Sequence, residues 1–251
     1  MVVRPPVPER IKQLKPLVLA REQVVAVADE LSALFPAGGL RRGSSIAISA
    51  GPGGGSRTLT AGLLANATAT GSWAAVVGVP GWNLAAAAEQ GVSLERIAIV
   101  DRPEPASWAT VVAALIGACD VVVAAPPPRV RAALVARVQA RARERGSVLM
   151  ITGGNATASA GLVRQADVHL KIESRTWRGL GVGHGHLRAA QATVEVTGRR
   201  QAARPRRFDL WLPGPDGRVG VVSTVADAGR GHDTAAARDA GPRTRRLRSV
   251  G

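Results

Sequence analysis

The sequence predicts an α/β fold: a mostly parallel sheet flanked by helices, with antiparallel strands at its C-terminal edge. Between residues 45 and 152, short apolar runs alternate with segments of helical periodicity, which is the order of a parallel sheet covered on both faces. After Thr152 the apolar residues alternate with polar ones, as in half-buried antiparallel strands. At 251 residues the chain is long enough for one such core with extensions.

Each element is predicted from its own pattern, beginning with a helix over residues 22–34, where apolar residues recur at helical spacing until Pro36. The parallel strands are expected at the short apolar or β-branched runs 45–50, 73–79, 96–100, 120–125 and 147–152. The helices between them are expected at 58–70, 83–91, 107–118 and 128–145. The antiparallel strands are expected around 168–173, 193–197 and 208–212.

These elements group into three predicted regions. Residues 1–35 form an N-terminal arm and helix, because the first twenty residues combine a proline-rich start with basic side chains. Residues 36–225 form the core domain. Residues 226–251 form a disordered basic tail, since Leu247 and Val250 are its only large apolar side chains.

A glycine-rich loop follows the first predicted strand of the core, in the position of a phosphate-binding loop. In a G-x-x-x-x-G-K-[ST] loop the backbone amides cradle phosphates, the Lys reaches the terminal phosphates and the Ser or Thr holds Mg²⁺. Gly51 and Thr58 match this pattern, but Ser56 replaces the second Gly and Arg57 replaces the Lys. The planar fork of an arginine is no substitute for the compact ammonium. We interpret this segment as a relic nucleotide loop, with an ordinary βα turn as the alternative. The residues of the relic loop are Gly51, Gly55, Ser56, Arg57 and Thr58.

The composition is strongly basic, and arginine supplies nearly all of the positive charge. The formal net charge is +15 and the pI is about 11.7, which predicts contact with a polyanion, either nucleic acid or an acidic protein surface. Aromatic residues are only 3% of the chain, so platforms for stacking bases are scarce. No apolar run is long enough to span a membrane and no secretory signal opens the chain, so a cytoplasmic protein without membrane contact is expected.

Residues that hold metals or act as nucleophiles are few. Cys119 is alone, which excludes an internal disulfide and a cysteine metal site. His184 and His186 would share one face of an extended strand, but no Cys or third His accompanies them. We therefore expect a solvent-facing hairpin there and no metal. Ser49 lies in no G-x-S-x-G elbow, so a serine hydrolase is not supported.

Several segments carry a family resemblance. The segment 35–43 before the first core strand, together with 91–97, 193–196 and 208–211, resembles the nucleotide-binding core of RecA recombinases. The segments LFPAGGLRRG (34–43), WRGLGVGHGHLR (177–188) and LPGPDGR (212–218) are closer still to the actinobacterial ImuA-type proteins, a divergent RecA-like group.

This resemblance implies a RecA-like, P-loop-type core and a role in the DNA damage (SOS) response. ImuA-type proteins serve error-prone translesion synthesis beside ImuB, a catalytically inert Y-family polymerase relative, and an error-prone C-family polymerase. The expected function is therefore that of a non-catalytic accessory factor in DNA-damage-induced mutagenesis, working by contacts with these two proteins.

The chain departs from active RecA enzymes at the acids that hydrolysis needs. No carboxylate occurs in residues 77–83, where the water-activating acid would stand, and the strand 120–125 runs into three prolines where RecA has an Asp. Asp120 lies at the wrong end of that strand for a ligand at the carboxyl edge of the sheet. We therefore expect no ATP hydrolysis and no cofactor, although residual ATP binding stays open. Two alternatives are kept: an ATPase that uses Arg57 in place of the Lys, and a non-specific DNA-binding module.

Arginines gather at the predicted turn between the last two antiparallel strands. Because the neighbouring segment in RecA faces the next subunit, we interpret this cluster as a candidate partner or DNA contact, with a solvated loop as the alternative. Its residues are Arg199, Arg200, Arg204, Arg206 and Arg207. The arginines of helix 128–145 are interpreted as a solvated basic face. Self-association stays open.

Overall fold

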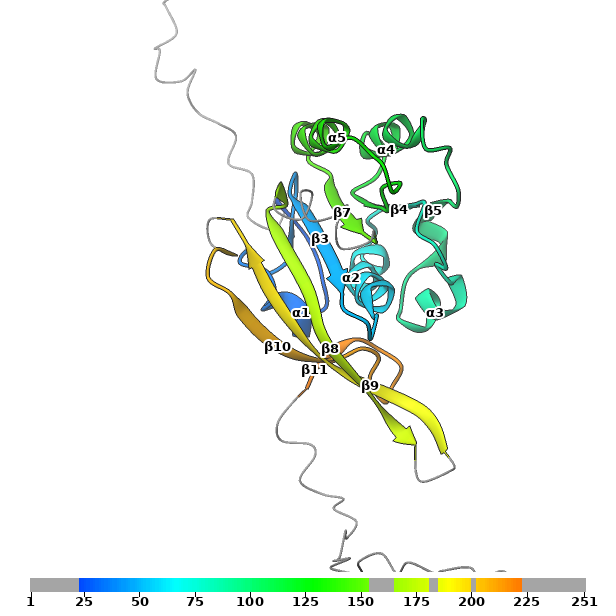
Figure 1. Cartoon of the computed structure of the whole chain (residues 1–251), viewed down its shortest axis with the longest axis vertical. Helices are drawn as coiled ribbons and strands as arrows, with labels where there is room; N and C mark the ends of the chain where they lie inside the picture. The colour runs from blue at the N-terminus through cyan, green and yellow to red at the C-terminus, as the bar shows by residue number, and fades with distance from the viewer. Residues whose placement is uncertain (1–22, 154–164, 181–184, 200–201, 223–251) are drawn as a thin grey trace, which may run out of the picture.

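The computed structural model describes residues 23–153, 165–180, 185–199 and 202–222 (Figure 1). Most of the predicted arm and all of the predicted basic tail lie outside these residues, as do His184 and Arg200. The described chain forms an α/β fold around a mixed nine-stranded sheet, with strand order β11-β10-β9-β8-β3-β7-β6-β4-β5. This confirms the predicted class: a mostly parallel sheet flanked by helices, continued by antiparallel strands.

The parallel half of the sheet contains the continuous apolar runs of the sequence. Neighbouring strands are parallel throughout, as predicted; they are β3 (Ser45–Ala50), β7 (Val148–Thr152), β6 (Val121–Ala124), β4 (Ala74–Val77) and β5 (Ile97–Val100). All four residues of β4 and of β6 are buried, because helices cover both faces of these strands.

Two helices cover each face of this half. On one face α2 (Ser56–Ala69) and α3 (Leu84–Glu89) bury Leu59, Leu63 and Ala87 against the sheet. On the other face α4 (Trp108–Ile116) and α5 (Ala132–Arg145) form a second core cluster around Trp108. A short 3₁₀ turn, η3 (Leu94–Arg96), leads into β5. The carboxyl ends of the parallel strands meet at one edge, where the glycine-rich loop lies.

The antiparallel half consists of β8 (Val168–Leu180), β9 (Gly185–Gly198), β10 (Arg206–Trp211) and β11 (Gly220–Val221). β8 joins the two halves, because it is parallel to β3 and antiparallel to β9. Leu170 and Ile172 face the core, whereas His169 and Lys171 face away from it, which confirms the predicted alternation. The paired β8 and β9 continue as a ribbon beyond the other strands (Figure 1).

The N-terminal segment differs from the helix predicted over residues 22–34. Val24 and Val25 form β1 (Val24–Val25), which pairs with β2 (Leu40–Arg41), and α1 (Asp29–Ser32) is a single turn. The two β-branched residues gain backbone partners in this small sheet, and α1 then begins at the acidic pair of Asp29 and Glu30. Leu31 and Leu34 are nevertheless buried in the main core.

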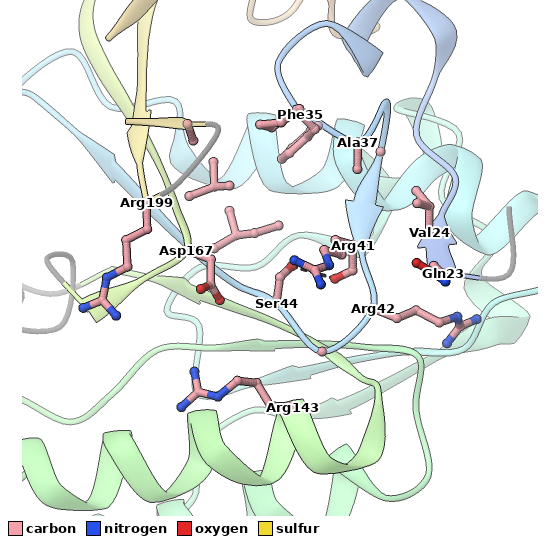
Figure 2. A pocket seen from close by; sticks show the side chains of 16 residues that line it. Gln23, Val24, Phe35, Ala37, Arg41, Arg42, Ser44, Arg143, Asp167 and Arg199 are labelled. Atoms are coloured by element: carbon pink, nitrogen blue, oxygen red, sulfur yellow. Dashed lines mark hydrogen bonds between the residues drawn. The ribbon is translucent and has the colours of Figure 1, made fainter. Parts of the chain in front are cut away.

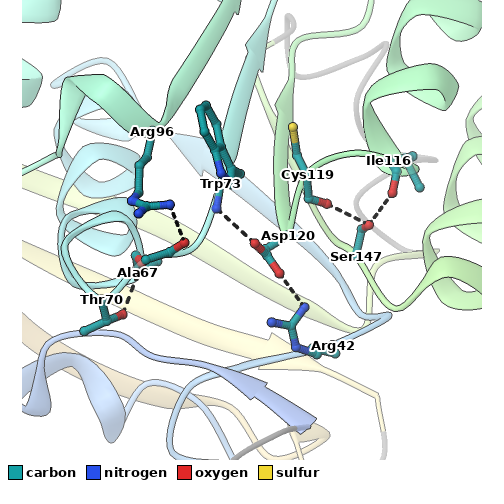
Figure 3. A network of polar contacts seen from close by, with 10 residues as sticks. Arg42, Ala67, Thr70, Trp73, Arg96, Ile116, Cys119, Asp120 and Ser147 are labelled. Carbon is teal, nitrogen blue, oxygen red and sulfur yellow. Dashed lines mark hydrogen bonds and ion pairs between the residues drawn. The ribbon is translucent and has the colours of Figure 1, made fainter.

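A polar network ties together the amino edge of the parallel sheet (Figure 3). The Asp120 carboxylate accepts hydrogen bonds from Arg42 Nη1 at 2.8 Å and from the Trp73 backbone amide at 2.9 Å. The Ser147 hydroxyl donates to the carbonyls of Ile116 and Cys119. Asp120 therefore lies at the edge opposite the glycine-rich loop, as the sequence predicted, and it anchors the strand ends.

Two further findings concern the described part of the chain. Cys119 is half-buried beside the second core cluster, and burial raises the pKa of its thiol, with Asp120 adding to the effect. None of the described helices combines the length and the apolar character that crossing a membrane requires.

Candidate functional site

The glycine-rich loop joins the end of β3 to the start of α2, at the carboxyl edge of the sheet. Gly54 and Gly55 take φ values of 67° and 106°, which side chains resist, and Gly55 caps the helix. The Gly51 amide donates to the Ile172 carbonyl at 3.0 Å, and the Gly54 amide donates to the Gly51 carbonyl at 3.0 Å. Two amides that could face an anion in a phosphate-binding loop are therefore bonded to protein carbonyls.

Arg57, at the position of the loop Lys, points away from the loop. Its Nη1 donates to the Pro80 carbonyl at 2.9 Å, and a Cβ on Gly81 would lie 3.4 Å from the same nitrogen. Arg57 and Thr58 line a cavity of about 250 Å³ with Trp82, whose indole nitrogen has no hydrogen-bond partner among the described residues. The guanidinium thus ties α2 to the turn after β4.

Arg175 of β8 lies over the loop, and the sequence analysis missed it. Its Nε donates to the Leu212 carbonyl at 2.9 Å, and its Nη1 lies 3.4 Å from the Gly53 carbonyl oxygen. A Cβ on Gly55 would meet Arg175 Cδ at 3.4 Å. The guanidinium also stacks on Trp177, 4.4 Å from the ring centroid, and burial lowers the pKa of this guanidinium below its usual range.

A β-bulge explains why Arg175 was missed. Simple alternation from Ile172 would place Ser174 on the core face of β8. The register shifts between Ile172 and Ser174, so that Arg175 pairs with Ala192 while Ile172 pairs with Val194. Ala192 and Val194 are both buried on the same face, and Arg175 is therefore turned toward the loop.

A contact between Ser49 and His169, which the sequence did not predict, joins β3 to β8 just before the loop. Ser49 Oγ lies 2.8 Å from His169 Nε2, and both residues are partly buried. Burial is the main cause that lowers the pKa of His169 below 6.5; the charge of Lys171 lowers it further, whereas Glu195 opposes the shift. His169 is therefore neutral at neutral pH. Only the pairing of β3 with β8 reveals this contact, because the two residues are far apart in sequence.

The predicted arginine cluster divides into structural and exposed members. Arg206 donates to the carbonyls of Ala33 and Leu34 at 3.0 and 3.1 Å, and its guanidinium lies 5.4 Å from the Phe208 ring centroid. Arg207 Nε lies 3.0 Å from a Glu173 carboxylate oxygen. Arg206 therefore ties β10 to the segment after α1, whereas Arg207 makes an exposed ion pair that contributes little to stability.

Arg199, Arg204 and Arg207 are the exposed described members of the cluster. β11 borders β10 only at Leu210 and Trp211, so Arg206 and Arg207 lie on a part of β10 whose outer side no described strand covers. Arg207 has a second carboxylate nearby, since its Nη2 lies 3.9 Å from Glu195.

Arg199 lines a cavity of about 870 Å³ at the amino edge of the sheet (Figure 2). Arg41 and Arg143 also line it, opposite Asp167. The Asp167 carboxylate accepts hydrogen bonds from the amide and hydroxyl of Ser45, at 2.9 and 3.0 Å. The cavity is therefore basic, and it opens at the edge opposite the glycine-rich loop. Among the described residues, no group of three or more His, Cys, Asp or Glu side chains is placed to hold a metal ion.

Comparison with known proteins identifies relatives in two ways. The chain is 41% identical over 103 residues to the uncharacterized protein Rv3395c of Mycobacterium tuberculosis. The match covers 40% of this chain and 50% of that protein, so the chain spans about half the length of the curated relative. Residues 33–158, half of the chain, match the family described as the MT3502 N-terminal domain. This segment runs from the end of α1 past β7 and includes the glycine-rich loop, and the chain therefore belongs to the MT3502 N-terminal domain family.

Proposed function

We propose that the chain is a non-catalytic, RecA-like accessory factor of DNA-damage-induced mutagenesis. It acts in error-prone translesion synthesis through contacts with an inert Y-family polymerase-like protein of the ImuB type and an error-prone C-family polymerase. The observation that carries the proposal is the state of the glycine-rich loop. Its two nearby guanidinium groups, Arg57 and Arg175, are both bonded to protein carbonyls.

The carboxyl edge of the sheet supports the absence of hydrolysis. Residues 78–83 follow β4 and residues 125–128 follow β6, and neither segment contains an Asp or Glu. Asp101, at the end of the neighbouring β5, is exposed and lies 3.2 Å from Arg102. A nucleotide hydrolase needs a carboxylate or an amide to orient water and an acid to organise Mg²⁺ beside the phosphates. Here the strand ends beside the loop supply glycines, prolines and apolar residues, and the one side-chain amide in these two segments, Asn83, accepts a hydrogen bond from the Ala86 amide at the start of α3.

The open face of the antiparallel half supports a role in binding proteins. β8, β9 and β10 present charged and polar side chains there, among them Lys171, Glu173, Glu195 and Arg207, and no described helix covers this face. A rigid, wide surface of mixed charge suits docking of another protein, because complementary charges set the register and the rate of association. The exposed Arg199 and Arg204 extend the surface toward acidic partners.

The first test measures ATP turnover. We expect the purified chain to stay at background with Mg²⁺ and ATP, with and without single-stranded DNA, because residues 78–83 and 125–128 supply no carboxylate beside the loop. Thr58→Ala is the control variant. If steady-state hydrolysis occurs and Thr58→Ala abolishes it, the chain is an ATPase that uses Arg57, and the proposal is wrong.

The second test concerns the partner surface. Arg199→Glu with Arg204→Glu should weaken binding to the ImuB-type protein and lower damage-induced mutation frequency, while the melting temperature stays within a few degrees because both side chains are exposed. The matched control is Arg137→Glu with Arg145→Glu on α5, the same charge change on another exposed face. Equal effects from both pairs would show that only the net charge of the protein matters. Unchanged binding in the first variant would exclude the surface around Arg199 and Arg204 as the binding site for the ImuB-type protein.

A further inference from the structure

The distal part of the β8–β9 hairpin is a free two-stranded ribbon. β8 pairs with β3 only as far as Ile172, and β9 is hydrogen-bonded to β10 and the segment after it as far as Ala190. Beyond Ala190 the two strands pair with each other, for example Arg178 with Ala189 and Leu180 with Gly185. The ribbon extends past the rest of the sheet (Figure 1). Such an extension is not needed to cover the core.

The ribbon is cationic and has no acidic residue. Arg178 and Arg188 lie on it, and residues 176–191 contain neither Asp nor Glu. The charges are present on both faces. Arg188 shares a face with Trp177, because it lies two residues from Ala190, with which Trp177 pairs. Arg178 lies on the other face, where its Nε donates to Gln191 Oε1 at 3.0 Å.

Large apolar side chains are exposed on the same ribbon. Leu180 is 64% exposed, Leu187 49% and Trp177 40%. Single exposed apolar residues are ordinary, but three on one narrow projection indicate a surface that contacts something. Leu180 and Leu187 lie near the ends of β8 and β9, at the far end of the described ribbon.

We propose that this ribbon binds in the major groove of duplex DNA. Two strands lie about 4.8 Å apart, and with their side chains they make a rod that fits the roughly 12 Å major groove but not the roughly 6 Å minor groove. A groove has phosphates on both walls, which matches arginines on both faces of the ribbon. A protein partner would dock against one face and leave the charges of the other in solvent. The bases meet Leu180 and Leu187, and the arginines contact phosphates, so affinity depends little on sequence.

This inference is independent of the proposed protein contacts, because it concerns DNA and a different part of the molecule. Its test therefore uses the purified full chain and a fluorescein-labelled duplex of about 20 base pairs, long enough for two turns of major groove. Fluorescence anisotropy across a salt series gives both the affinity and its salt dependence.

The decisive variant is Arg178→Ala with Arg188→Ala. Losing two phosphate contacts should weaken duplex binding on the order of 10-fold or more and reduce the slope of log K against log salt by about 2. The control, Arg137→Ala with Arg145→Ala on α5, removes the same charge and should change affinity less than about two-fold. An equal loss from the control pair would overturn the proposal in favour of general positive charge.

The groove itself is tested by competition and by the apolar end of the ribbon. Methyl green, which occupies the major groove, should displace the protein, whereas netropsin in the minor groove should not.

Leu180→Ala with Leu187→Ala should weaken binding several-fold without changing the salt slope, because no charge is removed. Tighter binding to single strands than to the duplex, or displacement by netropsin alone, would overturn the assignment. The assignment would also be overturned if the variant Arg178→Ala with Arg188→Ala kept its affinity for the duplex but no longer bound an acidic protein.

Discussion

The two halves of the sheet bury their side chains in different ways. In the parallel half helices cover both faces, and every residue of β4 and β6 is buried. In the antiparallel half the core-facing residues Leu170, Val194 and Leu210 are buried, while their neighbours along each strand face away. The first half therefore stabilises the fold, and the second supplies charged surface at little cost to the core.

Bonded and exposed arginines occur in both halves. Arg57 beside the parallel half and Arg206 on the antiparallel half donate to backbone carbonyls. Arg137 on α5 and Arg204 before β10 are exposed. Total charge therefore says little about where a polyanion binds. Three experiments test how the buried structure and the exposed surface are divided between the two halves.

The largest effect is expected in the parallel half. Trp108 is 2% exposed and fills the second core cluster, so Trp108→Ala should lower the free energy of unfolding by about 3–5 kcal/mol. Trp177→Ala on the ribbon is the matched change, and because that ring is 40% exposed we expect a loss of less than about 1 kcal/mol. Urea denaturation monitored by far-ultraviolet circular dichroism measures both. Equal losses would show that the two halves share the stability evenly.

An intermediate effect is expected where the halves meet the N-terminal segment. Arg206→Met keeps the aliphatic stem but removes the bonds to the Ala33 and Leu34 carbonyls, so the free energy of unfolding should fall by about 1–2 kcal/mol. Arg204→Met, at an exposed position, should change it by less than about 0.5 kcal/mol. If the two substitutions change the free energy of unfolding equally, Arg206 does not stabilise the fold. The prediction that the whole arginine cluster contacts a partner or DNA would then gain support.

The smallest effect is a pH dependence at the seam between the halves. Because the pKa of His169 is lowered below 6.5 in the fold, the unfolded chain binds a proton more readily below that pH. The stability contributed by neutral His169 is therefore complete above pH 6.5 and is lost as the pH falls toward the folded pKa. His169→Gln should reduce the difference between urea midpoints measured at about pH 5 and about pH 7.5. A variant with an unchanged difference would assign the pH dependence to other groups.

The fold was predictable because its signals are local. Continuous apolar runs marked the parallel strands, and alternation marked β8 to β10; each pattern directly reflects how many faces of a strand are covered. The N-terminal segment was less predictable. Val24 and Val25 fit a helical spacing, but pairing with β2 decides their conformation, and that partner lies beyond the window in which periodicity is read.

The candidate site was predictable only in part. The sequence located the glycine-rich loop and its substituted positions, but it did not reveal where Arg57 points, because that depends on the Pro80 carbonyl. Arg175 was hidden by a bulge, and the Ser49–His169 contact by strand pairing. Within the arginine cluster, the sequence could not separate Arg206 from Arg204, since one finds carbonyls on a distant segment and the other does not.

The helical turn α1 and the strand β11, near the two ends of the described chain, lie against each other. Glu30 of α1 reaches the backbone of Gly220 on β11, and Leu31 shares its core cluster with Leu210 and Val219. A ribosome releases the N-terminal segment long before β10 and β11 exist. Until then Leu31 has no finished surface to cover it, although the parallel strands can already pair. Nascent chains that end before β10 therefore expose an apolar N-terminal segment, and this is the stage at which a chaperone would bind and at which premature termination would lead to aggregation.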